Sequence, residues 1–174
     1  MAQGTGLRTM IKKICMLGSP AVGKTSLVNR FVQSVFSDRY LTTIGVRIDK
    51  KQIAMGGRDV TLMLWDMQGG DETHEIRLSH LRGASGYLLV VDGTRRATFD
   101  AACAIQERAE STIGKVPFLV LVNKADLTGE WQVDDDTLAE MRARGWAVSR
   151  TSAKEGEGVE EAFLTLAHQI LKDS

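Results

Sequence analysis

The segment Gly18-Ser19-Pro20-Ala21-Val22-Gly23-Lys24-Thr25 has the residue types needed to bind phosphate groups. It fits the pattern G-x-x-x-x-G-K-[ST] and lies between an apolar run and an amphipathic stretch. Glycines let backbone N–H groups surround an anion, and the start of a helix adds positive potential. The Lys24 ammonium can neutralise phosphate oxygens, and the Thr25 hydroxyl can bind Mg²⁺. The segment therefore predicts a nucleoside triphosphate site without identifying the base.

Two later segments identify a candidate base. Asn123-Lys124-Ala125-Asp126 follows the apolar run 118–122, where open α/β sheets bind ligands. The Asp126 carboxylate can accept hydrogen bonds from both guanine donors, N1–H and N2–H₂, which adenine lacks in that geometry. Thr151-Ser152-Ala153-Lys154 follows the last predicted strand, and the Ala153 N–H can meet guanine O6. Either segment alone fits a polar loop equally well. In this order, each after a strand, they predict a guanine nucleotide.

The elements that must position these residues alternate between strands and helices. Short apolar runs predict strands, and amphipathic stretches predict helices. The predicted strands are 11–17, 46–55, 60–66, 87–91, 118–122 and 146–149, and the predicted helices are 25–35, 72–81, 96–111, 135–144 and 157–171. Residues 56–59 form a turn between antiparallel strands. We therefore expect an α/β fold of three layers, with a mostly parallel six-stranded sheet, one antiparallel strand and about five helices.

Length and composition are those of an ordinary globular protein. The 174 residues suit one domain, over residues 11–174, after a loose leader at 1–10. Twenty-two basic residues balance twenty-two acidic ones, so bulk charge does not favour a nucleic-acid partner. Residues 134–136, three aspartates in a row, are expected to begin a helix and not to bind a metal.

Sequence signals for export or membrane attachment are missing. No apolar run approaches about 18 residues, and no secretory or lipidation motif is recognised. Cys15 and Cys103 lie in apolar settings and are expected to be buried free thiols. We therefore expect a cytoplasmic protein with no direct membrane anchor in this chain.

The chain resembles the Ras superfamily of small GTPases over about residues 11–171. The phosphate-binding segment, Tyr40 to Gly45, Trp65-Asp66 with Gly69, and the two base-reading segments occur in that family's order. Within the superfamily the chain is most similar to the Rab branch, because of Thr43-Ile44-Gly45-Val46, Trp65 and Arg82-Gly83-Ala84. The resemblance implies a G domain of the P-loop NTPase class that binds GTP and GDP with Mg²⁺.

The resemblance also implies roles for individual residues. Mg²⁺ would be bound by Thr25, Thr43 and Asp66, and Phe36 with the stem of Lys124 would sandwich the guanine ring. By sequence alone, Phe36 reads as a core aromatic. The groups carried over to catalysis are Lys24, Thr43, Gly69, Gln68 and Gly70. The nucleotide contacts carried over are Ser19, Pro20, Ala21, Val22, Gly23, Lys24, Thr25, Ser26, Phe36, Tyr40, Thr43, Gly69, Asn123, Lys124, Asp126, Ser152, Ala153 and Lys154.

Partners follow from the same resemblance. Residues 37–45 and 67–80 would be two switch segments, ordered by γ-phosphate and Mg²⁺ and released on hydrolysis. An effector, an exchange factor and an activating protein are expected to bind a monomer there. Ile48, His80 and Thr73 stand where Rab proteins carry aromatic residues, which argues against the usual Rab effectors.

The sequence departs from the family at the position that orients the attacking water. A glutamine normally follows the glycine equivalent to Gly69, and here that residue is Gly70, which has no side chain. We expect slow intrinsic hydrolysis. The alternative is a substitute: Gln68, one of the less favoured residues Asp71, Glu72 and His74, or a group supplied by a partner.

A second departure is Pro20, which fixes φ and removes an N–H at a position that is glycine or serine in relatives. It either obstructs an arginine delivered by a partner or is a tolerated loop proline. Two rival functions stay open: a scaffold held in the GTP form, and an adenine-nucleotide phosphotransferase, against which Asp126 argues.

Overall fold

The computed structural model describes residues 9–33, 39–41, 46–67 and 78–174. Its strands are β1 (Met10–Leu17), β2 (Arg39–Leu41), β3 (Arg47–Met55), β4 (Arg58–Asp66), β5 (Gly86–Asp92), β6 (Phe118–Asn123) and β7 (Val148–Arg150). Its α-helices are α1 (Lys24–Val32), α2 (Ala97–Ile113), α3 (Asp135–Ala143) and α4 (Val159–Lys172). Two 3₁₀ turns, η1 (Leu78–Leu81) and η2 (Thr128–Glu130), complete the described elements.

The strands form one sheet in the order β2-β3-β4-β1-β5-β6-β7. β4, β1, β5, β6 and β7 are parallel, whereas β3 runs antiparallel to β4 and β2 antiparallel to β3. The mostly parallel α/β sheet is therefore confirmed, and all six predicted strands are present. The three-residue β2 adds a seventh strand that the apolar pattern did not predict.

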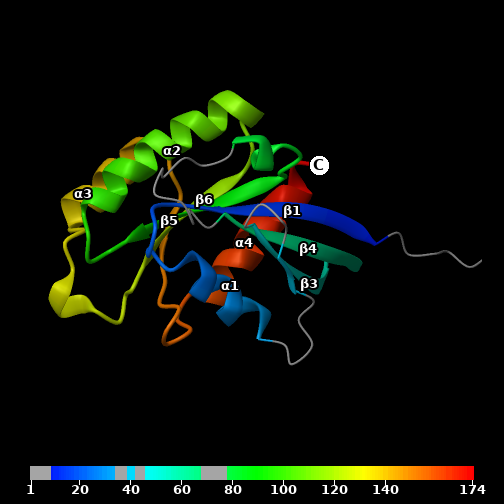
Figure 1. The fold of residues 1–174 in the computed structure, drawn as a ribbon, viewed down its shortest axis with the longest axis horizontal. Helices are drawn as coiled ribbons and strands as arrows, with labels where there is room; N and C mark the ends of the chain where they lie inside the picture. Colours follow the sequence, from blue (N-terminus) through cyan, green and yellow to red (C-terminus); the bar gives the residue numbers. More distant parts are fainter. Residues whose placement is uncertain (1–8, 34–38, 42–45, 68–77) are drawn as a thin grey trace, which may run out of the picture.

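Helices cover both faces of the sheet, as the apolar runs of β5 and β6 require. α2 and α3 lie on one face, and α1 and α4 on the other (Figure 1). The predicted helix 72–81 lies mainly outside the described residues, apart from η1. The described part of the chain thus contains four of the five expected helices.

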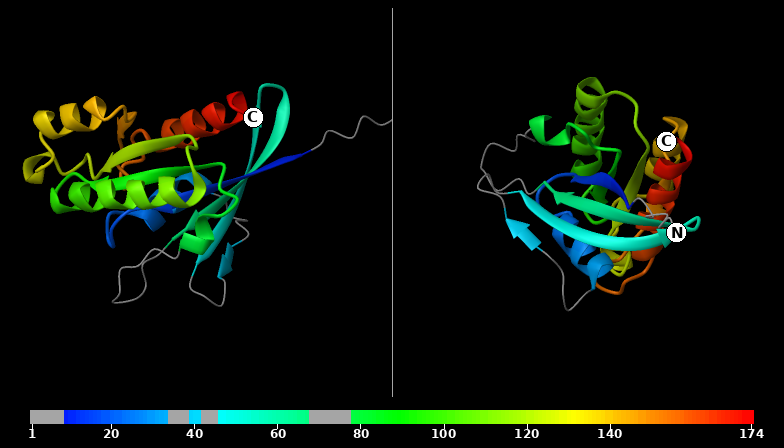
Figure 2. Two further views of the ribbon diagram at one scale, coloured as in Figure 1. Left: turned by 90° about the horizontal axis from the view of Figure 1, so that it is seen from above. Right: turned by 90° about the vertical axis from the view of Figure 1, so that its right-hand side faces the viewer.

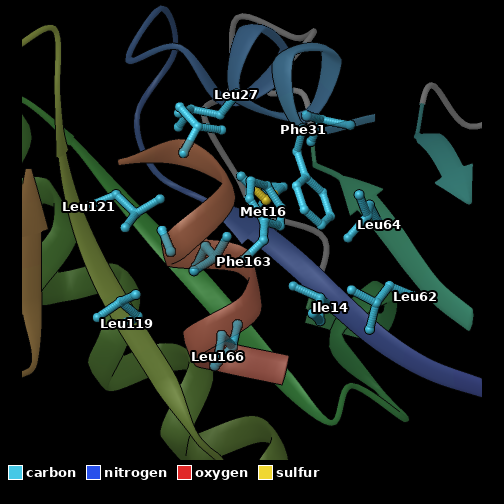
Figure 3. Close-up of a cluster of buried hydrophobic side chains, with 14 of the residues drawn as sticks. Ile14, Met16, Leu27, Phe31, Leu62, Leu64, Leu119, Leu121, Phe163 and Leu166 are labelled. Atoms are coloured by element: carbon cyan, nitrogen blue, oxygen red, sulfur yellow. The ribbon is translucent and has the colours of Figure 1, made fainter. Parts of the chain in front are cut away.

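Each face of the sheet has its own core. Under α1 and α4, the rings of Phe31 and Phe163 stack with centroids 4.2 Å apart, beside Met16 and Leu64 (Figure 3). Under α2 and α3, Phe99 and Trp146 meet edge to face at 6.2 Å. The apolar sides of both helix pairs are therefore buried against a sheet that is buried on both faces.

The β3–β4 hairpin forms a long twisted ribbon at one side of the molecule (Figure 2). Its loop is shorter than the predicted turn at 56–59. The loop contains only Gly56 and Gly57, with φ of 60° and 73°, and Met55 already pairs with Arg58. Two consecutive positive φ angles suit a two-residue turn, so the pairing of β3 with β4 continues up to the turn itself.

The expected helix start at residues 134–136 is confirmed. The side chain of Asp134 accepts a hydrogen bond from the Thr137 N–H and so begins α3. In the described part of the chain, no cluster of three or more His, Cys, Asp or Glu residues could hold a metal. Cys15 is buried as expected, but Cys103 is only half-buried on α2.

Candidate functional site

Every parallel strand ends at the same edge of the sheet, and several of the predicted site residues that the structure describes lie there. Asp66 closes β4 beside Met16 of β1, and Asp92 closes β5 directly opposite Asn123 of β6. β7 leads into Thr151 at the same edge. Parallel topology thus assembles one site from segments that are far apart in the sequence.

The loop between β1 and α1 has positive φ angles at both glycines of the phosphate-binding pattern. Gly18 has φ 147° and Gly23 φ 104°, and a Cβ on Gly18 would lie 2.5 Å from the carbonyl oxygen of Val90. A Cβ on Gly23 would collide with the Asn123 side chain. Ala21 also has a positive φ, 63°, without being glycine. Only glycine tolerates the first two sites, and Ala21 is held in a sparsely populated region.

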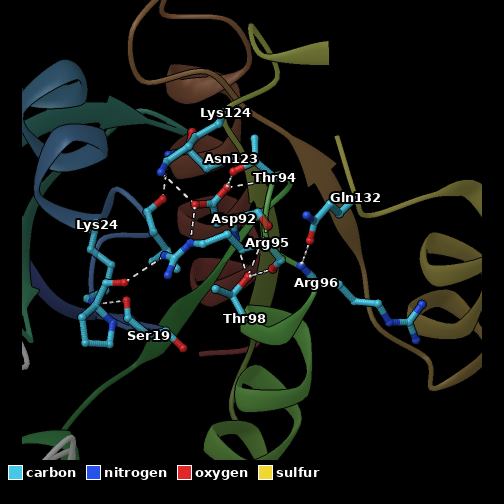
Figure 4. Close-up of polar contacts among 12 residues, drawn as sticks. Ser19, Lys24, Asp92, Thr94, Arg95, Arg96, Thr98, Asn123, Lys124 and Gln132 are labelled. Atoms are coloured by element: carbon cyan, nitrogen blue, oxygen red, sulfur yellow. Dashed lines mark hydrogen bonds and ion pairs between the residues drawn. The ribbon is translucent and has the colours of Figure 1, made fainter. Parts of the chain in front are cut away.

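Lys24, the first residue of α1, folds back over the loop that precedes it. Its Nζ donates to the carbonyl oxygens of Gly18 at 2.8 Å and Ser19 at 2.9 Å (Figure 4). Burial lowers the pKa of Lys24 to about 8, although the nearby Asp66 charge opposes this. A buried cation at the start of a helix suits a phosphate group, whose charge would offset the cost of desolvation.

Thr25 and Asp66 form a pair suited to a divalent cation. The Thr25 hydroxyl donates to Asp66 Oδ2 at 2.5 Å. Asp66 is fully buried, and its Oδ1 accepts no hydrogen bond from the residues that the structure describes. Burial raises the pKa of this carboxyl, whereas Thr25 and Lys24 lower it. A buried, incompletely satisfied carboxylate beside a hydroxyl has the hard oxygen ligands that Mg²⁺ prefers.

Asn123 joins the base-reading segments to the phosphate loop. Its Nδ2 donates to the Val22 carbonyl oxygen at 3.0 Å. Its Oδ1 accepts from the Thr151 hydroxyl at 3.1 Å and from the Ala153 N–H at 3.2 Å. One buried amide therefore connects the three motifs found in the sequence, which are separated by as many as 130 residues.

The two base-reading segments also contact each other directly. Ser152 donates from its hydroxyl to Asp126 Oδ1 at 2.8 Å, which fixes the orientation of the carboxylate. From α1, the Arg30 guanidinium donates to the backbone carbonyls of Lys154 and Glu155. The Lys154 side chain itself is exposed, as is that of Ser26.

The sequence analysis missed a buried carboxylate at this edge. Asp92 accepts from Lys124 Nζ at 2.7 Å and Arg95 Nε at 3.0 Å on one oxygen, and from the N–H and hydroxyl of Thr94 on the other (Figure 4). Burial alone would raise the pKa of Asp92, but these hydrogen bonds lower it to about 2. Arg95 also donates from Nη2 to the carbonyl oxygen of Pro20 at 3.0 Å.

Several predicted site residues lie outside the described part of the chain. These are Phe36, Thr43, Gln68, Gly69 and Gly70, with most of the segments 37–45 and 67–80. Tyr40 is described only in its backbone, as part of β2. Their roles remain predictions.

Two of the three positions compared with Rab aromatic residues, Ile48 and His80, lie beside Trp65 of β4, and the third, Thr73, lies outside the described residues. Trp65 and His80 meet with ring centroids 6.3 Å apart, and Ile48 pairs with Trp65 across the strands. Lys13 lies under Trp65, with Nζ 3.6 Å from the ring centroid, and donates to the His80 and Arg82 carbonyl oxygens. This surface thus combines the Trp65 ring with a half-buried cation, Lys13.

Comparison with known proteins identifies the family of this chain. The Ras family model matches residues 13–172. The chain is 34% identical to "Ras-related protein Rab7" of Pisum sativum, over 95% of this chain and 84% of that protein. It is 33% identical to the Rab7 protein of Cenchrus ciliaris, over 95% of this chain and 85% of that protein. The chain therefore belongs to the Ras family, and it is a Rab-like small GTPase that binds guanine nucleotides.

Proposed function

We propose that this GTPase is a Mg²⁺-dependent GTP/GDP switch, built as one G domain over residues 11–174, whose intrinsic hydrolysis is slow. The single observation that carries the nucleotide assignment is the buried Asn123 amide, which connects the phosphate loop to both base-reading segments. The Asp126 carboxylate, oriented by Ser152, suits the two donors of guanine.

Different residues would contact the phosphates, the Mg²⁺ ion and the guanine base. Lys24 and the backbone N–H groups of the phosphate loop stabilise charge on the phosphates while water attacks the γ-phosphorus. Thr25 and Asp66, together with Thr43, would hold Mg²⁺, which supplies further neutralisation of phosphate charge when bound. The Gly69 N–H would meet the γ-phosphate. Phe36 and Lys124 would hold the guanine ring between them.

Slow hydrolysis follows from Gly70. A side chain that orients the attacking water acts mainly in the transition state, so its loss lowers the rate of the chemical step without weakening binding. Gln68, two residues earlier, is the alternative water-positioning group, and a partner could supply another. These alternatives predict opposite results for two substitutions.

Single-turnover GTP hydrolysis tests the proposal. We expect Gly70→Gln to raise the rate about tenfold, equal to about 1.4 kcal/mol of barrier, at unchanged GTP affinity. Gln68→Ala is expected to have little effect. If Gln68→Ala abolishes hydrolysis and Gly70→Gln does nothing, Gln68 positions the water and the slow-switch proposal fails.

A scaffold held in the GTP form is the second candidate, and Gly70 is the observation that favours it. The nucleotide that copurifies with the protein separates the two. GDP would show that hydrolysis takes place, whereas GTP together with no measurable single-turnover cleavage would favour the scaffold.

Partners and location form the last part of the proposal. We expect a cytoplasmic monomer whose effector, exchange factor and activating protein bind at 37–45 and 67–80. In the described part of the chain, no helix is long and apolar enough to cross a membrane. The mixed surface around Trp65, Ile48 and His80 would select partners different from those of aromatic-rich Rab proteins.

A further inference from the structure

Arg95 links two parts of the site that the sequence motifs leave separate. It follows β5 by three residues, and its guanidinium reaches across 75 positions to the phosphate loop. Nε donates to Asp92 and Nη2 donates to the Pro20 carbonyl oxygen, both at 3.0 Å (Figure 4). The planar guanidinium suits this double contact because its donors are fixed relative to each other.

The anchor of Arg95 is rigid. Asp92 is fully buried and also accepts hydrogen bonds from Lys124 and Thr94. The Arg95 side chain is about half exposed, at 47%. An arginine held at one end by a buried carboxylate is therefore presented at the edge of the phosphate loop with its position already set.

The hydrogen bond from Arg95 to the Pro20 carbonyl oxygen determines the direction of the Ala21 N–H. A trans peptide unit is planar, and its C=O and N–H point in opposite directions. When Arg95 holds the Pro20 carbonyl outward, the N–H of Ala21 must point to the other side of the loop. One residue after Ala21, the Val22 carbonyl oxygen is likewise held, by a hydrogen bond from Asn123 Nδ2.

Ala21 lies between these two held carbonyls, at φ 63°. A non-glycine residue persists in that region only when its surroundings impose it. Pro20 adds to the constraint because its ring fixes φ. The side-chain contacts from Arg95 and Asn123 are two described interactions that constrain the backbone on either side of Ala21.

We propose that Arg95 is a positioning residue for the nucleotide phosphates: it holds the Pro20–Ala21 peptide plane so that the Ala21 N–H donates to a phosphate oxygen. This inference rests on the proposed nucleotide site. It gives position 20 a role through its backbone carbonyl, which is the group that Arg95 holds.

The neighbouring Arg96 provides a matched control. Its side chain is 49% exposed, almost the same as Arg95, but it points away from the phosphate loop, donating to Thr137 and pairing with Glu140 (Figure 4). Arg96→Ala thus removes the same charge at nearly the same place without touching the loop.

The test compares nucleotides with and without phosphates. We expect Arg95→Ala to raise the dissociation rates of GDP and GTP about tenfold, as for loss of a hydrogen bond from a charged donor. The affinity for guanosine, measured by competition, is expected to stay within twofold. Arg96→Ala should change none of these. Arg95→Lys should raise the dissociation rates less than Arg95→Ala does, because an ammonium can make one of the two contacts.

Two results would overturn the inference. The first is a GDP dissociation rate for Arg95→Ala within twofold of wild type. The second is an equal loss of guanosine and GDP affinity, which would mean that Arg95 acts through the base end of the site. A wild-type protein that binds neither GDP nor GTP would instead overturn the proposed function together with this inference.

Discussion

The hydroxyl of Thr25 donates a hydrogen bond to the carboxylate of Asp66, 41 residues further along the chain. Thr25 belongs to the first turn of α1 and Asp66 to the last position of β4. Because β1 and β4 are parallel neighbours, the start of the helix after β1 meets the end of β4. The same packing leaves the second oxygen of Asp66 buried and able to accept a further bond or a bound cation.

We expect Thr25→Asn to remove the Mg²⁺ dependence of GTP binding. The longer amide cannot keep an oxygen at the position of the hydroxyl, so GTP affinity in Mg²⁺ should fall tenfold or more. In a chelator, the variant and wild type should bind GTP alike. The half-exposed Thr112, whose hydroxyl bonds the Arg108 carbonyl on α2, provides a control as Thr112→Asn. An unchanged Mg²⁺ dependence in Thr25→Asn would remove Thr25 from the metal site.

Acid should destabilise the protein partly through Asp92. Its pKa is about 2 in the folded chain, below the ordinary value of 3.8, so the folded state binds fewer protons between these values. The stabilisation is therefore complete above about pH 4 and is lost as the pH falls toward 2. The difference of 3.8 − 2 = 1.8 corresponds to roughly 2 kcal/mol.

Urea unfolding of wild type and Asp92→Asn at several pH values measures this contribution. The difference in unfolding free energy between the two proteins should shrink by roughly 2 kcal/mol from pH 5 to pH 2. A difference that does not change with pH would show that the hydrogen bonds of Asp92 do not discriminate between its ionised and protonated forms.

The stacked pair of Phe31 and Phe163 should contribute strongly to stability. Both rings are buried, at 3% and 0% exposure, and they join α1 to α4. Phe163→Ala is expected to lower the unfolding free energy by about 3–5 kcal/mol, through lost apolar burial and the cavity left behind. Ile11→Ala, at a side chain that is 67% exposed, should stay within about 0.5 kcal/mol. Equal effects of the two substitutions would contradict the assigned core.

The strands could be predicted from the sequence for a physical reason. Apolar runs such as 87–91 and 118–122 belong to strands buried on both faces, whose pattern needs no knowledge of the partner strand. Their ends then fall at one edge of the sheet, so Asn123 and Thr151 could be placed near the phosphate loop before any contact was known.

The same reasoning could have found Asp92, because it closes the apolar run 87–91 as Asn123 closes the run 118–122. Arg95 could not have been found in this way. Its contact with Pro20 depends on how the loop after β5 lies against the loop after β1, and no periodicity encodes that placement. The short strand β2 was not predicted for a similar reason. Its three residues form a strand because they pair with the open edge of β3.

Asp126 provides the sharpest test of the base assignment. Its carboxylate has two acceptor oxygens, and Ser152 uses a lone pair of Oδ1 while leaving both oxygens able to accept from a base. In Asp126→Asn one oxygen becomes an NH₂ donor, which would face a guanine donor. We therefore expect guanine-nucleotide affinity to fall by several kcal/mol.

The same substitution should improve binding of a different base. Xanthine has a carbonyl where guanine has its 2-amino group, so the new amide N–H₂ of Asp126→Asn would find an acceptor. Competition between GDP and xanthosine diphosphate measures the change, which should reverse the preference of the wild type. Asp100→Asn, an exposed carboxylate in the first turn of α2, is the control and should leave the preference unchanged. If Asp126→Asn binds GDP within a few-fold of wild type and gains nothing for xanthosine diphosphate, Asp126 does not read the base.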